Sequence, residues 1–362
     1  MKIKILDMDD LENPHWGSGQ ARATYEISKR LGEKNDIEVF CSKYPNYKDY
    51  TLDNVKYTHI GLGTNNPKIN NIAYLLALPV SVISFKADVI LENFTAPIST
   101  CFSPIFTKIP VIGISSFFSS GNMDQKYKIN FSIIEKFGVK FYKYFIALNL
   151  QDEEKIKKLN PKINSKVIYN GVDKKYLKMK TVEKDYVLFI GRIDVNQKGL
   201  DILIQSFNKI KDLINDDLYI MGAGPDENIV NDLISKHNLQ SRVRLLGKLS
   251  GNTKDKYLSE AKIIVFPSRY EGHSIASLEA LALGKPLVVF DIAGFSWIDN
   301  VTAIKVKPFS EDLYSKGIEK LINDRDLRYS MSKKAKNLAL KFTWENTAAQ
   351  YKDFIKQISS VI

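Results

Sequence analysis

Two glutamates stand with seven residues between them in a stretch that is otherwise small and apolar. Glu271 follows the apolar run AKIIVFPS, and Glu279 lies within SIASLEALALG. Because carboxylates are seldom buried without a partner, we expect both to bind a polar ligand. A diol such as ribose suits Glu279, since both carboxylate oxygens accept hydrogen bonds. The alternatives for Glu279 are a helix-surface position or an ion pair with a lysine such as Lys285.

Two cations occupy a strand-to-helix connection in LFIGRIDVNQKGLDIL. The strand is predicted to end at Gly191 and the helix to begin near Gly199, with Arg192 and Lys198 between them. In a parallel α/β sheet this connection lies at the carboxyl edge, where ligands bind and helix N-termini carry partial positive charge. Two cations there suit a diphosphate. The alternative is a solvated loop with two ordinary surface charges.

Two glycine-containing turns give weaker signals. LYIMGAGPDEN is a strand, a turn and a helix, but it lacks the third glycine of a dinucleotide-binding fingerprint, so a tight turn is the simpler interpretation. Gly272 and Ser274 stand where the helix containing Glu279 would begin. Backbone N–H groups at that helix start are therefore expected to face an anion.

Short apolar strands alternate with helical patterns along the whole chain. The first half contains KIKIL, the amphipathic helix GQARATYEISKRLG, then IEVFC, DVILEN, PVIGIS and YFIALN. The second half repeats this alternation from residue 185, after a lysine-rich linker at 167–180. Such alternation predicts parallel sheets covered by helices on both faces. We therefore expect two Rossmann-like domains, with the cleft between them as the ligand site.

Composition narrows the class of protein. The chain has 362 residues, 44% hydrophobic and 26% charged, which favours two globular domains. No apolar run reaches about 18 residues, and IAYLLALPVSVISF is interrupted by Pro79. The N-terminus leads directly into a strand, which predicts no signal peptide and a cytoplasmic protein. Cys41 and Cys101 are expected to be buried thiols, and the four scattered histidines make a zinc site improbable.

The second half resembles the retaining glycosyltransferases of family 4, which have the GT-B fold. The spacing of Glu271 and Glu279 looks like the E-x7-E motif of that family, and several weaker motifs follow in the family's order. They are VIYNGVD, GRIDVNQKGLDILIQSF, LYIMGAGP, VRLLGKLSGNTKDKYLSEAKIIVFPSRYEG, SLEALALGKPLVV, IKVKPFSEDLYSKGIEKLIND and FTWENTAAQYKDF. In the first half the resemblance is limited to WGSGQAR and IPVIGIS.

The resemblance implies three domain segments. Residues 1–175 would form an N-terminal acceptor-binding Rossmann-like domain. Residues 176–343 would form a C-terminal Rossmann-like domain that binds the nucleotide sugar. Residues 344–362 would be a C-terminal helix that returns to the N-terminal domain.

The resemblance also implies roles for individual residues. Arg192 and Lys198 would hold the donor diphosphate and offset charge on the leaving nucleotide, and Glu271 would contact hydroxyls of the donor sugar. Glu279 would bind the ribose, and the stretch from Leu245 to Leu249 would meet the base. The loop from Gly17 to Gly19 would lie near the phosphates and the acceptor. The backbone of four successive residues would meet the phosphate or sugar: Gly272, His273, Ser274 and Ile275.

The sequence departs from the family at two places. A histidine is usual after the strand that PVIGIS resembles, where Ser116 or a neighbour stands here. His15 is the first-half histidine in a plausible site loop, and either it replaces the family histidine or it is an ordinary loop residue near a tryptophan. DIAGFSWI keeps Gly294 but lacks the family's paired glycines and glutamate. Because this region lies near the donor sugar in the family, the resemblance does not decide which sugar is transferred.

Metal and cofactor are not expected. Fixed cations at the diphosphate would do what magnesium does in other transferases. The letters of a D-x-D motif occur at Asp7 and Asp9, in a segment interpreted as a loop after the first strand. The expected ligand is therefore a nucleoside diphosphate sugar, as donor substrate and not as a cofactor.

The excess of positive charge is uneven. The chain has a formal charge of +11, and residues 121–180 hold fourteen lysines, no arginine and six acids. Within that segment, residues 126–143 mix lysines with aromatic and aliphatic residues at helical spacing. We expect them to contact an anionic membrane surface, the alternative being an amphipathic helix with a buried apolar face. Nucleic acid is not expected, because no recognised binding motif accompanies the lysines.

The sequence thus predicts an α/β protein with the GT-B fold that acts as a metal-independent, retaining glycosyltransferase. It would move a hexose from a UDP- or GDP-sugar to a hydroxyl of a glycan or lipid-linked acceptor in cell-surface polysaccharide or glycolipid synthesis. It would work in the cytoplasm, at the inner face of the membrane. Two alternatives remain: a sugar-nucleotide epimerase of the same fold, and a non-catalytic sugar-nucleotide-binding scaffold. The product distinguishes them.

Overall fold

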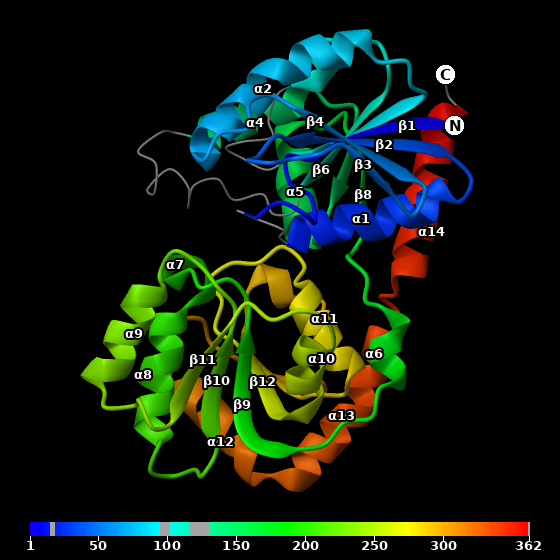
Figure 1. The fold of residues 1–362 in the computed structure, drawn as a ribbon. Coiled ribbons are helices and arrows are strands. Elements are labelled where there is room, and N and C mark those ends of the chain that lie inside the picture. The colour runs from blue at the N-terminus through cyan, green and yellow to red at the C-terminus, as the bar shows by residue number, and fades with distance from the viewer. Residues whose placement is uncertain (15–18, 95–101, 116–130, 361–362) are drawn as a thin grey trace. The chain divides into compact units, whose positions relative to one another are not determined.

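The computed structural model describes residues 1–14, 19–94, 102–115 and 131–360. The chain divides into two compact units (Figure 1). Unit 1 comprises Met1–Asn170 and Trp344–Ile362, and unit 2 comprises Gly171–Thr343. The chain therefore leaves unit 1 once and returns to it at the end.

Unit 1 is built on a sheet in the strand order β3-β4-β2-β1-β5-β6-β7-β8. All neighbours pair in parallel except β3 and β4, which are antiparallel. The strands are β1 Lys2–Leu6, β2 Asp36–Ser42, β3 Tyr50–Leu52, β4 Val55–Ile60, β5 Val89–Asn93, β6 Val111–Ser115, β7 Tyr144–Ala147 and β8 Asn164–Val167. Strands buried on both faces read as continuous apolar runs, which is why KIKIL and PVIGIS were recognisable in the sequence.

Helices cover this sheet on both faces. Figure 1 shows α2 on the side of the sheet opposite α1. The helices are α1 Gly19–Gly32, α2 Pro67–Ser84, α4 Phe131–Gly138, α5 Leu150–Leu159 and α14 Trp344–Ser359, with the short 3₁₀ helices η1 Ser103–Ile105 and η2 Val139–Phe141. α1 has the predicted bounds. Pro79, expected to interrupt an apolar run, lies inside α2.

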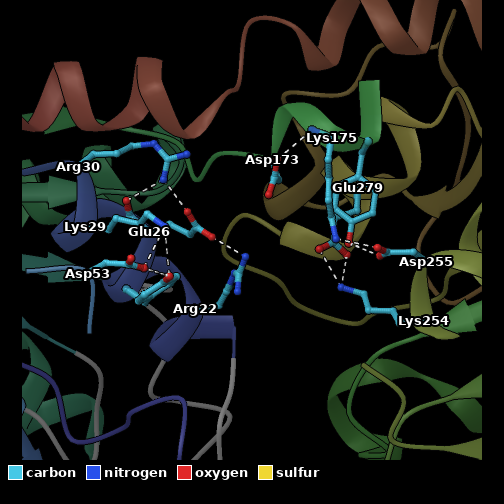
Figure 2. A network of polar contacts seen from close by, with 12 residues as sticks. Arg22, Glu26, Lys29, Arg30, Asp53, Asp173, Lys175, Lys254, Asp255 and Glu279 are labelled. Carbon is cyan, nitrogen blue, oxygen red and sulfur yellow. Dashed lines mark hydrogen bonds and ion pairs between the residues drawn. The ribbon is translucent and has the colours of Figure 1, made fainter. Parts of the chain in front are cut away.

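The C-terminal helix α14 belongs to unit 1 and packs on α1. It buries Trp344 and Tyr351, and Thr347 donates to the carbonyl of Tyr169 at 3.0 Å. Arg30 of α1 contacts Glu345 at 2.8 Å. Glu26 of the same helix also contacts Arg30 (Figure 2). Apolar burial supplies most of the stability of such a contact, since exposed ion pairs contribute about 0–1 kcal/mol.

Unit 2 is built on a fully parallel sheet in the order β11-β10-β9-β12-β13-β14. The strands are β9 Lys184–Ile190, β10 Asp217–Met221, β11 Val243–Gly247, β12 Ala261–Phe266, β13 Leu287–Phe290 and β14 Ala303–Val306. The helices are α6 Lys174–Lys178, α7 Val195–Lys198, α8 Leu200–Ile210, α9 Glu227–Lys236, α10 Gly251–Glu260, α11 Ile275–Ala282, α12 Glu311–Asn323 and α13 Arg325–Ala339, with the 3₁₀ helix η3 Ala293–Phe295. Two apolar cores lie on the two faces of the sheet.

The boundary differs in detail from the prediction. The chain enters unit 2 at Gly171, whereas the predicted second domain began at residue 176. The stretch predicted as a linker is packed, because Ile168, Val172 and Tyr176 are buried. The sequence did not predict this packing, because three buried apolar side chains among lysines show neither the period of a strand nor that of a helix.

Glycines allow close backbone approach at the carboxyl edge of the second sheet. Gly199, just after Lys198, has φ of +67°, and a Cβ there would lie 2.1 Å from the carbonyl oxygen of Pro267. Pro267 follows β12, so this contact fixes the end of α7 against the loop after β12.

We predict that Gly199→Ala destabilises the protein by about 2–5 kcal/mol, because it adds a clash to the cost of a positive φ. Gly247→Ala is the matched control, since Gly247 has φ of +71° and nothing lies within 4 Å of the place that a Cβ would take there. The control should lose only about 1–2 kcal/mol. Urea denaturation measures both, and equal losses would show that the approach to Pro267 does not matter.

Candidate active site

The loops after β9 and β12 meet at one edge of the second sheet, because these two strands are parallel neighbours. Lys198, from α7, donates to Oε1 of Glu271 at 2.5 Å. The same oxygen accepts a hydrogen bond from Ser268 at 2.7 Å. The side chains of Lys198 and Glu271 are 16% and 8% exposed. The structure thus brings together a predicted diphosphate-binding cation and a predicted sugar-binding carboxylate.

Arg192 lies in the same loop but turns to other partners. Its guanidinium donates to Gln197 at 2.7 Å and lies 3.6 Å from the carboxylate of Asp194. Its side chain is 41% exposed. Arg192 can therefore reach an anion at this edge without breaking a buried ion pair.

Glu279 lies in α11, as predicted, and a lysine holds its carboxylate. Lys254, from α10, lies 2.8 Å from Oε1 and 2.7 Å from Oε2 of Glu279 (Figure 2). The suggested alternative partner, Lys285, is wrong: its ammonium donates to the carbonyl of Val182 at 3.1 Å. Burial lowers the pKa of Lys285 to about 8. Lys254 was missed because a lysine in the polar run TKDKYL gives no sign of facing inward.

A second polar cluster supports α10 beside Glu279. The hydroxyl of Tyr176 donates to Asp255 at 2.7 Å, and Lys175 donates to the other oxygen of Asp255 at 2.6 Å (Figure 2). Burial first, and then the charge of Glu279, raises the pKa of Tyr176. Since Tyr176 and Lys175 belong to α6, the start of unit 2 helps to position the helix that carries Lys254.

The start of α11 has the expected geometry. Ser274 is the N-cap residue, and its side chain accepts a hydrogen bond from the backbone of Ser277. Gly272 is buried just before the cap, and Ile275 is the first helical residue. Leu249, predicted near the base, is half-buried after β11, at the same carboxyl edge of the sheet.

The side chain of His273 is buried among aromatic rings. Its ring centroid lies 4.5 Å from that of Trp297 and 5.5 Å from that of Phe342. Burial lowers the pKa of His273 to about 3, so the imidazole is neutral at neutral pH. The side chain therefore packs and brings no positive charge to a phosphate, which leaves its backbone as the group that can face a ligand.

Two further residues shape the edge, and sequence reasoning did not assign them these roles. Arg269 binds both carboxylate oxygens of Asp201, at 2.9 and 2.7 Å, and donates to the carbonyl of Val195. It thereby ties the loop after β12 to α7 and α8. A Cβ at Gly294 would lie 2.4 Å from the carbonyl oxygen of Glu271, so only glycine lets η3 approach this glutamate so closely.

The first unit contributes fewer described candidates. Gly19 is the first residue of α1. His15, Gly17 and Ser116 lie outside the described residues. Within the described ranges, no cluster of three or more His, Cys, Asp or Glu side chains is placed to hold a metal ion.

Asp7 follows β1 in a loop, as predicted, but it is fully buried. It accepts hydrogen bonds from Gln20, at 2.7 Å, and from Thr24, both in the first turns of α1. Burial raises the pKa of Asp7 to about 6, while these hydrogen bonds act in the opposite direction. Asp7 therefore fastens the start of α1 to the end of β1.

Comparison with known proteins assigns the second unit. Residues 174–338 match the family model described as "Glycosyl transferases group 1". They are a glycosyl transferases group 1 domain. All the described site residues of unit 2 lie within this glycosyltransferase domain.

Two relatives extend the similarity. The uncharacterized glycosyltransferase MJ1607 of Methanocaldococcus jannaschii is 31% identical over 209 residues, which cover 52% of this chain and 53% of that protein. The chain thus matches about half the length of this relative. The uncharacterized glycosyltransferase MJ1178 of the same organism is 26% identical over 99% of both chains. Together with the domain match, these relatives show that the chain contains a glycosyltransferase domain.

Solved structures establish the fold. A sucrose-phosphate synthase from Thermosynechococcus elongatus matches with a TM-score of 0.81 and 16% identity over 100% of both chains. The Anabaena protein Alr3699/HepE, solved in complex with UDP-glucose, matches with a TM-score of 0.77 and 15% identity over 100% of both chains. The chain has the GT-B fold, as predicted.

The raised pKa of Asp7 gives a pH-dependent prediction. A carboxyl group whose pKa is raised on folding stabilises the fold below its unfolded pKa, and this stabilisation is lost as pH rises through about 6. Asp7→Asn, which stays neutral, should therefore raise stability at pH 7.5 by roughly 3 kcal/mol and change it little at pH 4. Thermal melting at the two pH values measures this, with the exposed Asp326→Asn as control. The same gain at both pH values would contradict it.

Proposed function

We propose that the protein is a metal-independent, retaining glycosyltransferase of family 4, with Glu271 and Glu279 as its E-x7-E motif. It moves a hexose from a UDP- or GDP-sugar to a hydroxyl of a glycan or lipid-linked acceptor in cell-surface polysaccharide or glycolipid synthesis. The observation that carries this proposal is the pair of lysine–glutamate contacts at one sheet edge, inside a glycosyl transferases group 1 domain.

The Lys198–Glu271 contact suits the sugar diphosphate part of a nucleotide sugar, and the Lys254–Glu279 contact suits its ribose. A diphosphate that approaches the edge competes with Glu271 for Lys198 and draws in the exposed guanidinium of Arg192. Glu271 then has an oxygen to offer a sugar hydroxyl. Glu279, oriented by Lys254 through both oxygens, has lone pairs left to accept hydrogen bonds from the ribose diol.

In the proposed reaction, the bond between the sugar C1 and the phosphate oxygen breaks while the acceptor oxygen bonds to C1 from the same face. The acceptor proton passes to an oxygen of the leaving diphosphate. Lys198 and Arg192 offset the negative charge that develops on that diphosphate, which is the work a metal ion does in other transferases. Each substrate atom is accounted for, and no oxidant or cofactor is needed.

The surroundings of the enzyme are also part of the proposal. Cys41 is a free, buried thiol, which fits a reducing compartment such as the cytoplasm. Cys101 lies outside the described residues. Contact with an anionic membrane surface through residues 126–143 remains a prediction. The described part of that segment exposes Ile133 and Phe137 together with Lys136 and Lys140.

The direct test is product analysis with UDP-glucose and GDP-mannose in the presence of a metal chelator. Glu271→Ala and Arg192→Ala should each lower turnover by on the order of 10²–10³. Arg325→Ala, an exposed arginine at the start of α13, is the control and should retain wild-type turnover.

The identity of the product separates the alternatives. A sugar joined to an acceptor with its anomeric configuration kept supports the proposal. A donor with one changed stereocentre would instead identify an epimerase, and donor binding without turnover would identify a scaffold. Losses of tenfold or less in both variants would remove Glu271 and Arg192 from the proposed roles.

A further inference from the structure

Helix α2 has two apolar faces, and only one is covered. Tyr74, Leu78 and Val82 point into the core of unit 1. The opposite face exposes five aliphatic side chains, with exposed fractions between 45% and 73%: Ile69, Ile72, Leu76, Val80 and Ile83. Their spacing of three or four residues aligns them in one stripe along the helix. A helix that is apolar all round is normally buried on every side. Here no element of the described residues buries the stripe.

Other elements of unit 1 also expose apolar side chains. The 3₁₀ helix η1 contacts α2 and exposes Ile105. Phe102, just before η1, contacts Phe141 of η2 with ring centroids 5.6 Å apart. The 3₁₀ helix η2 follows α4, which exposes Ile133 and Phe137. An exposed apolar stripe such as that of α2 is uncommon on soluble proteins and marks a binding site for a protein or a membrane.

Exposed charged side chains in the described residues between 61 and 143 are almost all positive. In the described residues between 61 and 143, six lysines are exposed: Lys68, Lys86, Lys108, Lys136, Lys140 and Lys143. One acid in the same described ranges is exposed, Asp88, and it accepts a hydrogen bond from the backbone of Lys2 at 2.7 Å. Lys68 and Lys86 stand at the two ends of the stripe. At the Lys86 end, Lys2, Lys4, Asp36 and Glu38 line the same hollow as Lys86, and Lys4 pairs with Glu38. The ends of the stripe therefore keep an excess of positive charge beside the aliphatic side chains.

This combination of aliphatic and positively charged side chains distinguishes between two possible binding partners of the stripe, a second copy of the chain and a lipid surface. A second copy of the chain, paired stripe to stripe, would bring the positive ends of two stripes together and be repelled. An anionic lipid surface accepts the aliphatic side chains below its headgroups and attracts the lysines at headgroup level. Among the helices that the structure describes, none combines the length and apolarity needed to cross a bilayer. The stripe is thus suited to lie in the membrane interface.

We propose that the stripe of α2, defined by Ile69, Ile72, Leu76, Val80 and Ile83, docks unit 1 on the surface of an anionic phospholipid membrane. The helix lies along the surface, with Lys68 and Lys86 on the headgroups. This goes beyond the proposed transfer reaction, because docking needs neither donor nor acceptor. It also places the main contact on α2, whereas the sequence predicted the contact at residues 126–143.

Co-sedimentation with vesicles tests the proposal on the full-length protein. The wild type should bind vesicles of phosphatidylcholine with phosphatidylglycerol, bind pure phosphatidylcholine vesicles at least tenfold more weakly, and be released by high salt. Leu76→Gln combined with Val80→Gln should reduce binding to the anionic vesicles about tenfold or more. Both side chains are 73% exposed, so unchanged circular dichroism and melting would show that the variant is folded.

The matched control places the same change on unit 2. Leu213→Gln combined with Ile229→Gln replaces two exposed aliphatic side chains and should leave vesicle binding at the wild-type level. Lys68→Gln combined with Lys86→Gln should weaken binding to anionic vesicles only.

Three results would overturn the proposal. The first is wild-type binding by the α2 variant. The second is equal binding of the wild type to neutral and anionic vesicles. The third is a wild-type dimer in sedimentation velocity that the α2 variant separates, which would make the stripe an interface between copies. Transfer activity is measured separately with a soluble acceptor, so its loss alone would not count against docking.

Discussion

Two buried carboxylates at the carboxyl edge of the second sheet constrain this structure. Glu271 and Glu279 are mostly hidden from water, and each is held by a lysine from a different element. Removing one partner of such a pair leaves a buried, unpaired charge, which lowers the free energy of unfolding by about 3–5 kcal/mol. The two pairs are therefore needed for stability, and they also supply the groups that we expect to bind the ligand. A ligand can replace these contacts only if it brings both anions and hydroxyl groups, as a sugar diphosphate does.

The sequence predicted the elements that carry this edge well. Apolar runs located β9, β10, β12 and β13, and the bounds of α1 were as predicted. The resemblance placed Lys198 and Glu271 at one ligand, but that their loops meet follows from the pairing of β9 with β12, which the sequence did not predict. The order of weak motifs then predicted the GT-B fold, which the similarity to solved structures confirms.

Contacts that depend on side-chain direction could not be predicted. The partner of Glu279 is Lys254 and not Lys285, because helix phase and not sequence proximity decides which ammonium reaches the carboxylate. The stripe of α2 was not predicted, because its segment stands in the sequence as an apolar run interrupted by Pro79. A helix with two apolar faces shows no amphipathic period. Gly294 was predicted as a family match, but its close approach to Glu271 depends on how the fold brings η3 beside the loop after β12.

The most direct test of the proposed donor site is calorimetric titration with UDP, GDP and ADP in the presence of a metal chelator. We predict that one nucleotide binds with a dissociation constant in the range of about 1–100 μM, and that Arg192→Ala weakens this binding at least tenfold, about 1.4 kcal/mol. The exposed Arg325→Ala should bind as the wild type does. If none of the three nucleotides binds the wild-type protein, or if Arg192→Ala binds equally well, the edge of the second sheet is not the donor site proposed here.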